Sequence, residues 1–133
     1  MLNLPQLKGK HIMDIRVGNG YDVHLLAPEL EFWLGGIKIE HTKGCVAHSD
    51  GDTLIHALCD AMLGALALGD IGKHFPDNSA EFKGIDSKIL LARTNDLIKS
   101  KGYSLVNADC TILLQKPKVA PYIIPMRECL AGV

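Results

Sequence analysis

The chain has 133 residues, of which 47% are hydrophobic and 22% are charged, and its net charge is −1. This length and composition suit a single globular domain, and the lack of a basic excess argues against nucleic acid as a partner. No apolar run in the sequence approaches the roughly 20 residues that a membrane-spanning helix needs, so no membrane partner is predicted.

Residues 1–14 are predicted to be a leader that is disordered or non-native. They have neither the apolar core of a secretory signal nor the Arg and Ser content of a transit peptide, so neither kind of targeting peptide is predicted. Residues 15–133 are predicted to form the single domain. The four cysteines are far apart and form no C-x-x-C pair, so we expect reduced thiols in a cytoplasm, and a plastid origin is left open as the alternative.

The first predicted strand covers residues 13–17, where apolar and polar residues alternate. It ends at the turn-prone run 18–20. Asp22 and His24 therefore follow a strand end, which is a favoured position for functional residues.

Residues 32–34 and 37–39 flank Gly35-Gly36, a pattern typical of a two-residue β-hairpin. The next predicted element is a helix over residues 52–68 that is apolar on almost every side and should be buried. Buried unpaired charge is costly, so any polar stripe on such a helix needs a purpose. The stripe consists of Asp52, His56 and Asp60.

The start of this helix has an alternative interpretation that involves no chemistry. Ser49 could be the N-cap, with Asp52 three residues later in a variant of the capping box. Capping accounts for Ser49 and Asp52, but it leaves His48, Asp50 and His56 unexplained.

Residues 69–85 are rich in Gly, Pro and Asp and are predicted to be a long functional loop. A second helix is predicted over residues 87–101, a strand over 103–114, and a short third helix over 121–131. Three strands make a thin sheet for three helices, and the sequence ends just after the last one. We therefore expect the domain to be incomplete at its C-terminus.

Asp22, His24 and His56 are the candidate metal ligands. On an extended segment Asp22 and His24 point to the same side, and His56 lies on the polar stripe of the helix. Three protein ligands that leave a fourth position open are typical of a catalytic zinc site. Taken singly, each has an ordinary alternative: a solvated acid with an incidental histidine, or a satisfied core histidine.

Several blocks occur in a fixed order along the chain, and together they resemble one family, the 2-C-methyl-D-erythritol 2,4-cyclodiphosphate synthases of the non-mevalonate route to isoprenoids. The blocks are Asp22-Val23-His24, Ala47-His48-Ser49-Asp50-Gly51-Asp52 with His56, Leu68-Gly69-Asp70-Ile71-Gly72, Phe75-Pro76-Asp77, residues 82–87, Lys101-Gly102-Tyr103, and Gln115-Lys116-Pro117-Lys118 through Pro121.

The resemblance implies an α/β fold of the α+β type, with a mixed sheet, helices packed on one face, and a homotrimer whose active sites lie between subunits. It implies a metal-dependent phosphorus–oxygen lyase. The enzyme would convert 4-diphosphocytidyl-2-C-methyl-D-erythritol 2-phosphate to 2-C-methyl-D-erythritol 2,4-cyclodiphosphate and release CMP. A Zn²⁺ or similar divalent ion at the triad would act as Lewis acid and template.

The resemblance also implies which residues contact the substrate. Asp22, Val23 and His24 would lie beside it, and His48 and Ser49 would hold its phosphates, with His48 as the catalytic residue that stabilises the transition state. The diol region would meet Asp70, Ile71 and Gly72, and the erythritol would meet the loop of Phe75, Pro76, Asp77, Asn78 and Ser79. The cytosine pocket would comprise Leu114, Gln115, Lys116, Pro117, Lys118, Val119 and Ala120, although by itself the 115–118 run is equally a charged turn.

Family members carry a Thr-Thr-Glu segment that this sequence lacks, and its Glu binds a second ion, Mg²⁺ or Mn²⁺. This difference leaves two alternatives to the synthase open. One is a truncated, zinc-binding remnant of the enzyme without turnover. The other is a generic metal-dependent hydrolase, which would release phosphate without forming a cyclic product.

Overall fold

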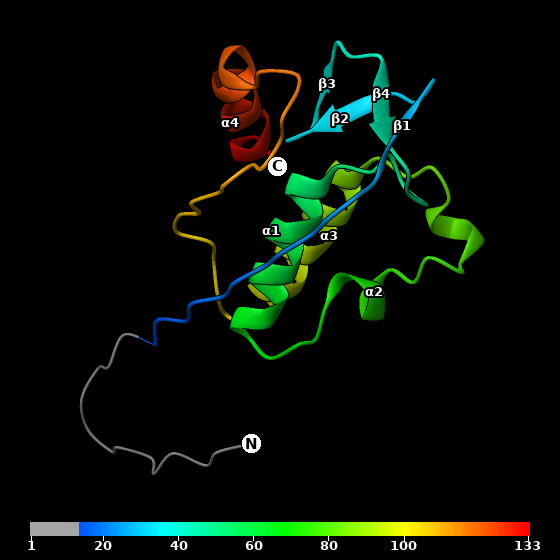
Figure 1. Cartoon of the computed structure of the whole chain (residues 1–133). Coiled ribbons are helices and arrows are strands. Elements are labelled where there is room, and N and C mark those ends of the chain that lie inside the picture. The colour runs from blue at the N-terminus through cyan, green and yellow to red at the C-terminus, as the bar shows by residue number, and fades with distance from the viewer. Residues whose placement is uncertain (1–13) are drawn as a thin grey trace, which may run out of the picture.

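Short antiparallel strands precede the helices along the chain (Figure 1). The computed structural model describes residues 14–133, so the predicted leader lies outside the described residues except for Asp14. The strands are β1 (Leu26–Pro28), β2 (Phe32–Leu34), β3 (Ile37–Ile39) and β4 (Lys43–Cys45). The helices are α1 (Thr53–Ala65), α2 (Ile71–His74), α3 (Ser87–Ser100) and α4 (Ile123–Ala131), with 3₁₀ turns η1 (Ala80–Phe82) and η2 (Ala120–Tyr122).

The predicted hairpin is confirmed. Strand β2 pairs with β3 in antiparallel register, and Leu34 lies opposite Ile37. The turn residues Gly35 and Gly36 have φ angles of 60° and 79°, a region that side-chain-bearing residues enter only with strain. A second antiparallel pair, β1 with β4, was not predicted. The α+β class is thus confirmed, and its sheet consists of two antiparallel ribbons rather than one mixed sheet in the described residues.

The strands predicted over residues 13–17 and 103–114 are wrong for this structure in the part that is described. Residues 14–17 and 103–114 carry no ladder pairing. Val17 is 89% exposed and Val106 is 90% exposed. A strand requires a neighbour for its backbone N–H and C=O groups, and alternation of apolar residues marks a face without supplying that neighbour.

The helices agree well with the sequence. Helix α1 is the predicted buried helix and packs beside α3 (Figure 1). Their shared core includes Ile55, Met62, Leu91 and Ile98. The third predicted helix begins as η2 and continues as α4, whose Met126 packs against the hairpin. The loop predicted over 69–85 holds two short helical turns, α2 and η1. No helix in residues 14–133 is both long and apolar enough to cross a bilayer.

The N-cap of α1 is Asp52, so the alternative in which Ser49 caps this helix is wrong. The Asp52 carboxylate is fully buried and accepts the N–H of Ile55 at 3.0 Å. It also accepts the N–H groups of Gly35 at 2.9 Å and Gly36 at 2.6 Å. Burial raises the pKa of Asp52, and these three N–H donors oppose that rise. One carboxylate therefore fixes the hairpin turn to the start of α1, one helical turn before His56.

We expect Asp52→Asn to lower the free energy of unfolding by about 1–3 kcal/mol, because its amide N–H₂ would face a buried backbone N–H and leave that donor unpaired. Urea denaturation measures the change. Asp86→Asn is the matched control, since Asp86 caps α3 from a side chain that is partly exposed. Equal stability of the parent and Asp52→Asn would contradict the proposed clamp.

Candidate metal centre

An extended segment, residues 18–25, lies directly across α1 (Figure 1). A Cβ atom added at Gly18 would lie 1.8 Å from the carbonyl oxygen of Ala61. One added at Gly20 would lie 1.8 Å from the carbonyl oxygen of Ala57. The two glycines therefore let the backbone of the segment touch the backbone of the helix, close to His56.

The two sides of this segment differ in character. Successive side chains of an extended chain point to opposite sides. Gly18 and Gly20 face α1, so Asp22 and His24 are presented toward the helix as well. The alternate residues on the other side, Tyr21, Val23 and Leu25, are at least 70% exposed. The register set by the glycines thus delivers both predicted ligands to the third one.

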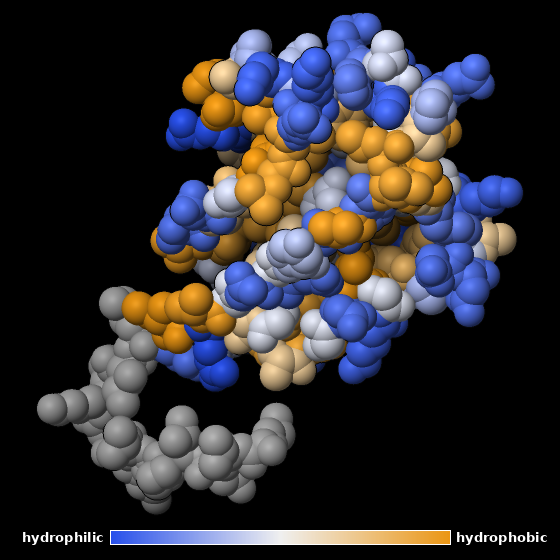
Figure 2. Space-filling model, in the orientation of Figure 1, coloured by the Kyte–Doolittle hydropathy of each residue, from blue (hydrophilic) through white to orange (hydrophobic). Residues whose placement is uncertain are grey.

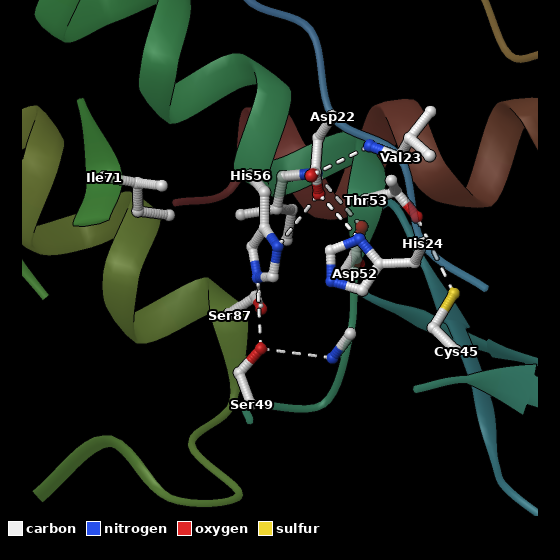
Figure 3. Close-up of polar contacts among 12 residues, drawn as sticks. Asp22, Val23, His24, Cys45, Ser49, Asp52, Thr53, His56, Ile71 and Ser87 are labelled. Carbon is white, nitrogen blue, oxygen red and sulfur yellow. Dashed lines mark hydrogen bonds and ion pairs between the residues drawn. The ribbon is translucent and has the colours of Figure 1, made fainter. Parts of the chain in front are cut away.

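The structure brings the three predicted metal ligands together (Figure 3). The Oδ2 atom of Asp22 lies 3.0 Å from Nδ1 of His24 and 3.1 Å from Nδ1 of His56. Two ligand atoms, each roughly 2 Å from a tetrahedral ion, are about 3.3 Å apart. The two observed separations are close to that value, and the ligand atoms of the triad all lie within 4.8 Å of one another, so the arrangement suits a divalent ion.

The electrostatics of the triad also suit a cation. Burial raises the pKa of Asp22, but the contacts with His24 and His56 together lower it by more than burial raises it. The pKa of Asp22 is therefore well below its usual range. The same carboxylate raises the pKa of His24. The Nδ1 atom of His24 is buried and makes no well-aligned hydrogen bond within residues 14–133. A buried ring nitrogen that meets a carboxylate without a well-aligned hydrogen bond is unusual, and a bound ion would give it a partner.

The far side of the His56 ring carries contacts that the sequence did not predict. Its Nε2 atom lies 3.0 Å from Oγ of Ser87 and 3.1 Å from Oγ of Ser49. Ser87 donates its hydroxyl hydrogen to the Asp50 carboxylate, which also accepts the N–H of Ser87 at 2.9 Å. The available signal was that Asp50 remained unexplained by capping, and that Ser87 opens the next helix.

The other predicted site residues lie in several separate segments of the chain. His48 contacts the backbone oxygen of Ser79 through Nε2 at 3.2 Å, which joins the predicted phosphate-binding block to the 75–79 loop. Asp70 caps α2. Phe75, in the same loop, packs edge-on against Phe82. The predicted cytosine segment, 114–120, leads into η2, and its Leu114 and Val119 pack against the hairpin core.

Comparison with known proteins decides the family. The profile of the YgbB family matches residues 15–133. The chain belongs to this family. One relative, the 2-C-methyl-D-erythritol 2,4-cyclodiphosphate synthase of Parabacteroides distasonis, is 58% identical over 121 residues, which cover 91% of this chain and 75% of the relative. The enzyme of the same name from Fusobacterium nucleatum is 53% identical over 119 residues, covering 90% and 74%.

Solved structures of such synthases share the fold. A 2C-methyl-D-erythritol-2,4-cyclodiphosphate synthase in a form with bound CDP superposes with a TM-score of 0.83 at 37% identity, over 88% of this chain and 78% of that one. The CDP complex of IspF from Plasmodium falciparum gives a TM-score of 0.74 at 34% identity, over 88% and 71%. The family predicted from the sequence is therefore confirmed.

Proposed function

We propose that this chain converts 4-diphosphocytidyl-2-C-methyl-D-erythritol 2-phosphate to 2-C-methyl-D-erythritol 2,4-cyclodiphosphate with release of CMP. The observation that carries the proposal is the Asp22, His24 and His56 triad, formed in a chain that matches cyclodiphosphate synthases over residues 15–133. An oxygen of the 2-phosphate would bond to the β-phosphorus, and the bond from that phosphorus to the CMP oxygen would break. No protein nucleophile is needed, so catalysis depends on positioning and on neutralising charge.

The triad would hold one divalent ion, and its one carboxylate and two imidazoles are ligands that suit Zn²⁺. When bound, the ion would supply Lewis-acid chemistry to a phosphate oxygen. A second Mg²⁺ or Mn²⁺ ion is not assigned to any residue of this chain.

Ser49 and His48 are proposed to hold the phosphates. Ser49 Oγ accepts the N–H of Gly51 at 3.2 Å and lies 3.1 Å from Nε2 of His56. With both contacts on its oxygen, the Ser49 hydroxyl hydrogen is free to point toward a phosphate oxygen. A donor fixed in place before the reaction, such as Ser49 or the His48 ring, stabilises developing charge without reorganisation.

The remaining substrate contacts follow from the segments around the triad. We propose that Asp70–Gly72 and Phe75–Ser79 contact the diol and the erythritol, and that Leu114–Ala120 forms the cytosine pocket. The contact between His48 and Ser79 joins the 75–79 loop to the proposed phosphate-binding block, and this supports a contact between that loop and the erythritol. The CDP found in two similar structures supports a cytidine nucleotide as ligand.

A homotrimer with active sites between subunits is part of the proposal, and a bacterial cytoplasmic location is a further part. The supporting observation for assembly is apolar surface. Figure 2 shows apolar areas between hydrophilic ones on one face of the molecule. Large apolar residues are exposed on the outer side of the extended segment and just before it: Tyr21, Val23 and Leu25 on the segment, and Ile15 and Val17 before it. Such surface on a small domain marks an association site.

The test is incubation of the full chain with the diphosphocytidyl substrate, Zn²⁺ and Mg²⁺. We expect phosphorus NMR to detect equal amounts of CMP and the cyclic diphosphate. Zinc binding without CMP release would instead identify the remnant that does not turn over, and inorganic phosphate without a cyclic product would identify a hydrolase.

We expect His48→Ala to reduce kcat by about 10²–10³, the usual effect of losing one transition-state donor, while bound zinc stays at the parental level. His41→Ala is the matched control, because His41 packs beside Phe32 and not at the triad. Near-parental turnover of His48→Ala would remove this residue from the catalytic machinery.

A further inference from the structure

We propose that Ser87 and Asp50 are positioning residues that hold the His56 ring with its proton on Nε2, which leaves Nδ1 free to bind the metal. This inference rests on the metal site of the proposed function. It concerns two residues outside the triad, and neither would touch the ion or the substrate.

The first step is the hydrogen-bonding pattern of Asp50. Its carboxylate accepts the backbone N–H of Ser87 at 2.9 Å, the backbone N–H of Asp52 at 3.1 Å and the hydroxyl of Ser87. An ionised carboxylate only accepts hydrogen bonds, and three donors converge on this one. The single hydroxyl hydrogen of Ser87 is therefore committed to Asp50.

The second step concerns the His56 ring. Ser87 Oγ lies 3.0 Å from Nε2 of His56. Because the serine has no hydrogen left to donate, its oxygen can only accept, so Nε2 must carry the proton. Ser49 Oγ, at 3.1 Å from the same nitrogen, offers a second acceptor. Figure 3 shows both serines on the side of the ring opposite Asp22.

The third step is the consequence at the other nitrogen. In a neutral imidazole with its proton on Nε2, Nδ1 presents a lone pair. That lone pair points at the Asp22 carboxylate, whose Oδ2 is 3.1 Å away. Two acceptors at this distance repel each other unless a cation lies between them. By holding the proton on Nε2, Ser87 and Asp50 make the space between Nδ1 of His56 and the Asp22 carboxylate a cation site, where a simple hydrogen bond would otherwise form.

The pair is held in place by contacts that do not involve His56. Ser87 is fully buried at the first residue of α3. Backbone hydrogen bonds from Asp50 to Ile85 at 3.1 Å and from Gly84 to His48 at 2.7 Å join the two segments. The acceptor for Nε2 therefore exists before the ring meets it. Metal-binding histidines commonly donate their second N–H to a carboxylate or carbonyl. Here the Ser87 hydroxyl lies between the ring N–H and the Asp50 carboxylate.

The experiment measures the Kd for Zn²⁺ by competition with a chromophoric chelator, together with the visible spectrum of bound Co²⁺ and thermal unfolding. We expect Ser87→Ala to weaken zinc binding by about 10–100-fold, the usual effect of losing such a partner, and to alter the Co²⁺ spectrum. Ser87→Thr keeps the hydroxyl and should restore the parental Kd. Thr94→Val removes another buried hydroxyl of α3 and should leave the Kd unchanged.

The outcomes separate this inference from the proposed function. If the parent binds zinc at the triad and Ser87→Ala binds it equally well, the positioning role is wrong and the metal site stands. If the parent binds no zinc there, both are wrong. If Ser87→Ala does not fold, Asp50→Asn decides, because it replaces the charged acceptor of the Ser87 hydroxyl with a neutral amide. A parental Kd in Asp50→Asn would likewise overturn the inference.

Discussion

Replacing His56 with alanine is expected to reduce bound zinc from about one ion per chain to nearly none, because catalytic zinc sites keep three protein ligands and only Asp22 and His24 would remain. His24→Ala should have the same effect, since its Nδ1 atom is buried in the triad without a well-aligned partner. Metal analysis after gel filtration in zinc-free buffer measures the stoichiometry.

The control for this experiment is His74→Ala. The Nε2 atom of His74 contacts the backbone oxygen of Leu68 at 3.0 Å, so that ring lies in the α2 region, outside the triad. Parental zinc content is expected in this variant. Stoichiometric zinc in both His24→Ala and His56→Ala would show that the metal binds elsewhere.

Substituting Gly20 with alanine is expected to damage the metal site without removing any ligand. Its Cβ would lie 1.8 Å from the carbonyl oxygen of Ala57 and 2.7 Å from the amide nitrogen of Ala61, so the segment must move away from α1. Inserting an atom into such a contact destabilises a protein by about 1–3 kcal/mol. Asp22 lies two residues further along and would move with the segment, so zinc binding should weaken as well.

Urea unfolding and zinc titration of the same variant measure the two effects. Gly64→Ala, on α1 itself, is the matched control, because its Cβ would have no neighbour closer than 4.0 Å. Alanine in a helix interior is favoured over glycine, so this control should be neutral or stabilised by up to about 1 kcal/mol. Parental zinc affinity in Gly20→Ala would mean that the segment does not need its close approach to α1.

The polar stripe of α1 shows how far the sequence could predict the site. Because the helix is buried, each of its three polar side chains was expected to have a polar partner, and each has one. Asp52 accepts a backbone N–H of the hairpin turn, His56 contacts Asp22 in the triad, and Asp60 accepts the N–H of Ile71 at 2.7 Å. Spacing identified the stripe but could not assign these partners, because they lie 11 to 34 residues away in the chain.

Other contacts could not be predicted from the sequence, because they too join residues that are far apart in the chain. The tight hairpin is encoded locally by Gly35-Gly36, and the helices by continuous apolar faces, so both were predictable. The pairing of β1 with β4 joins Leu26 to Cys45 across an intervening hairpin and has no local signature. The Ser87–Asp50 contact spans 37 residues and is fixed by backbone hydrogen bonds that no composition rule indicates.

The extended segment 18–25 has a consequence for how the chain responds to its surroundings. Its inner side carries Asp22 and His24, its outer side carries Tyr21, Val23 and Leu25, and both belong to one short stretch of backbone. An ion on the inner side reduces the conformational entropy that remains to be lost when the outer side is covered. Reciprocity then requires that covering the outer side tighten ion binding by the same factor. In the proposed homotrimer, metal binding at the triad and contact between subunits would therefore strengthen each other.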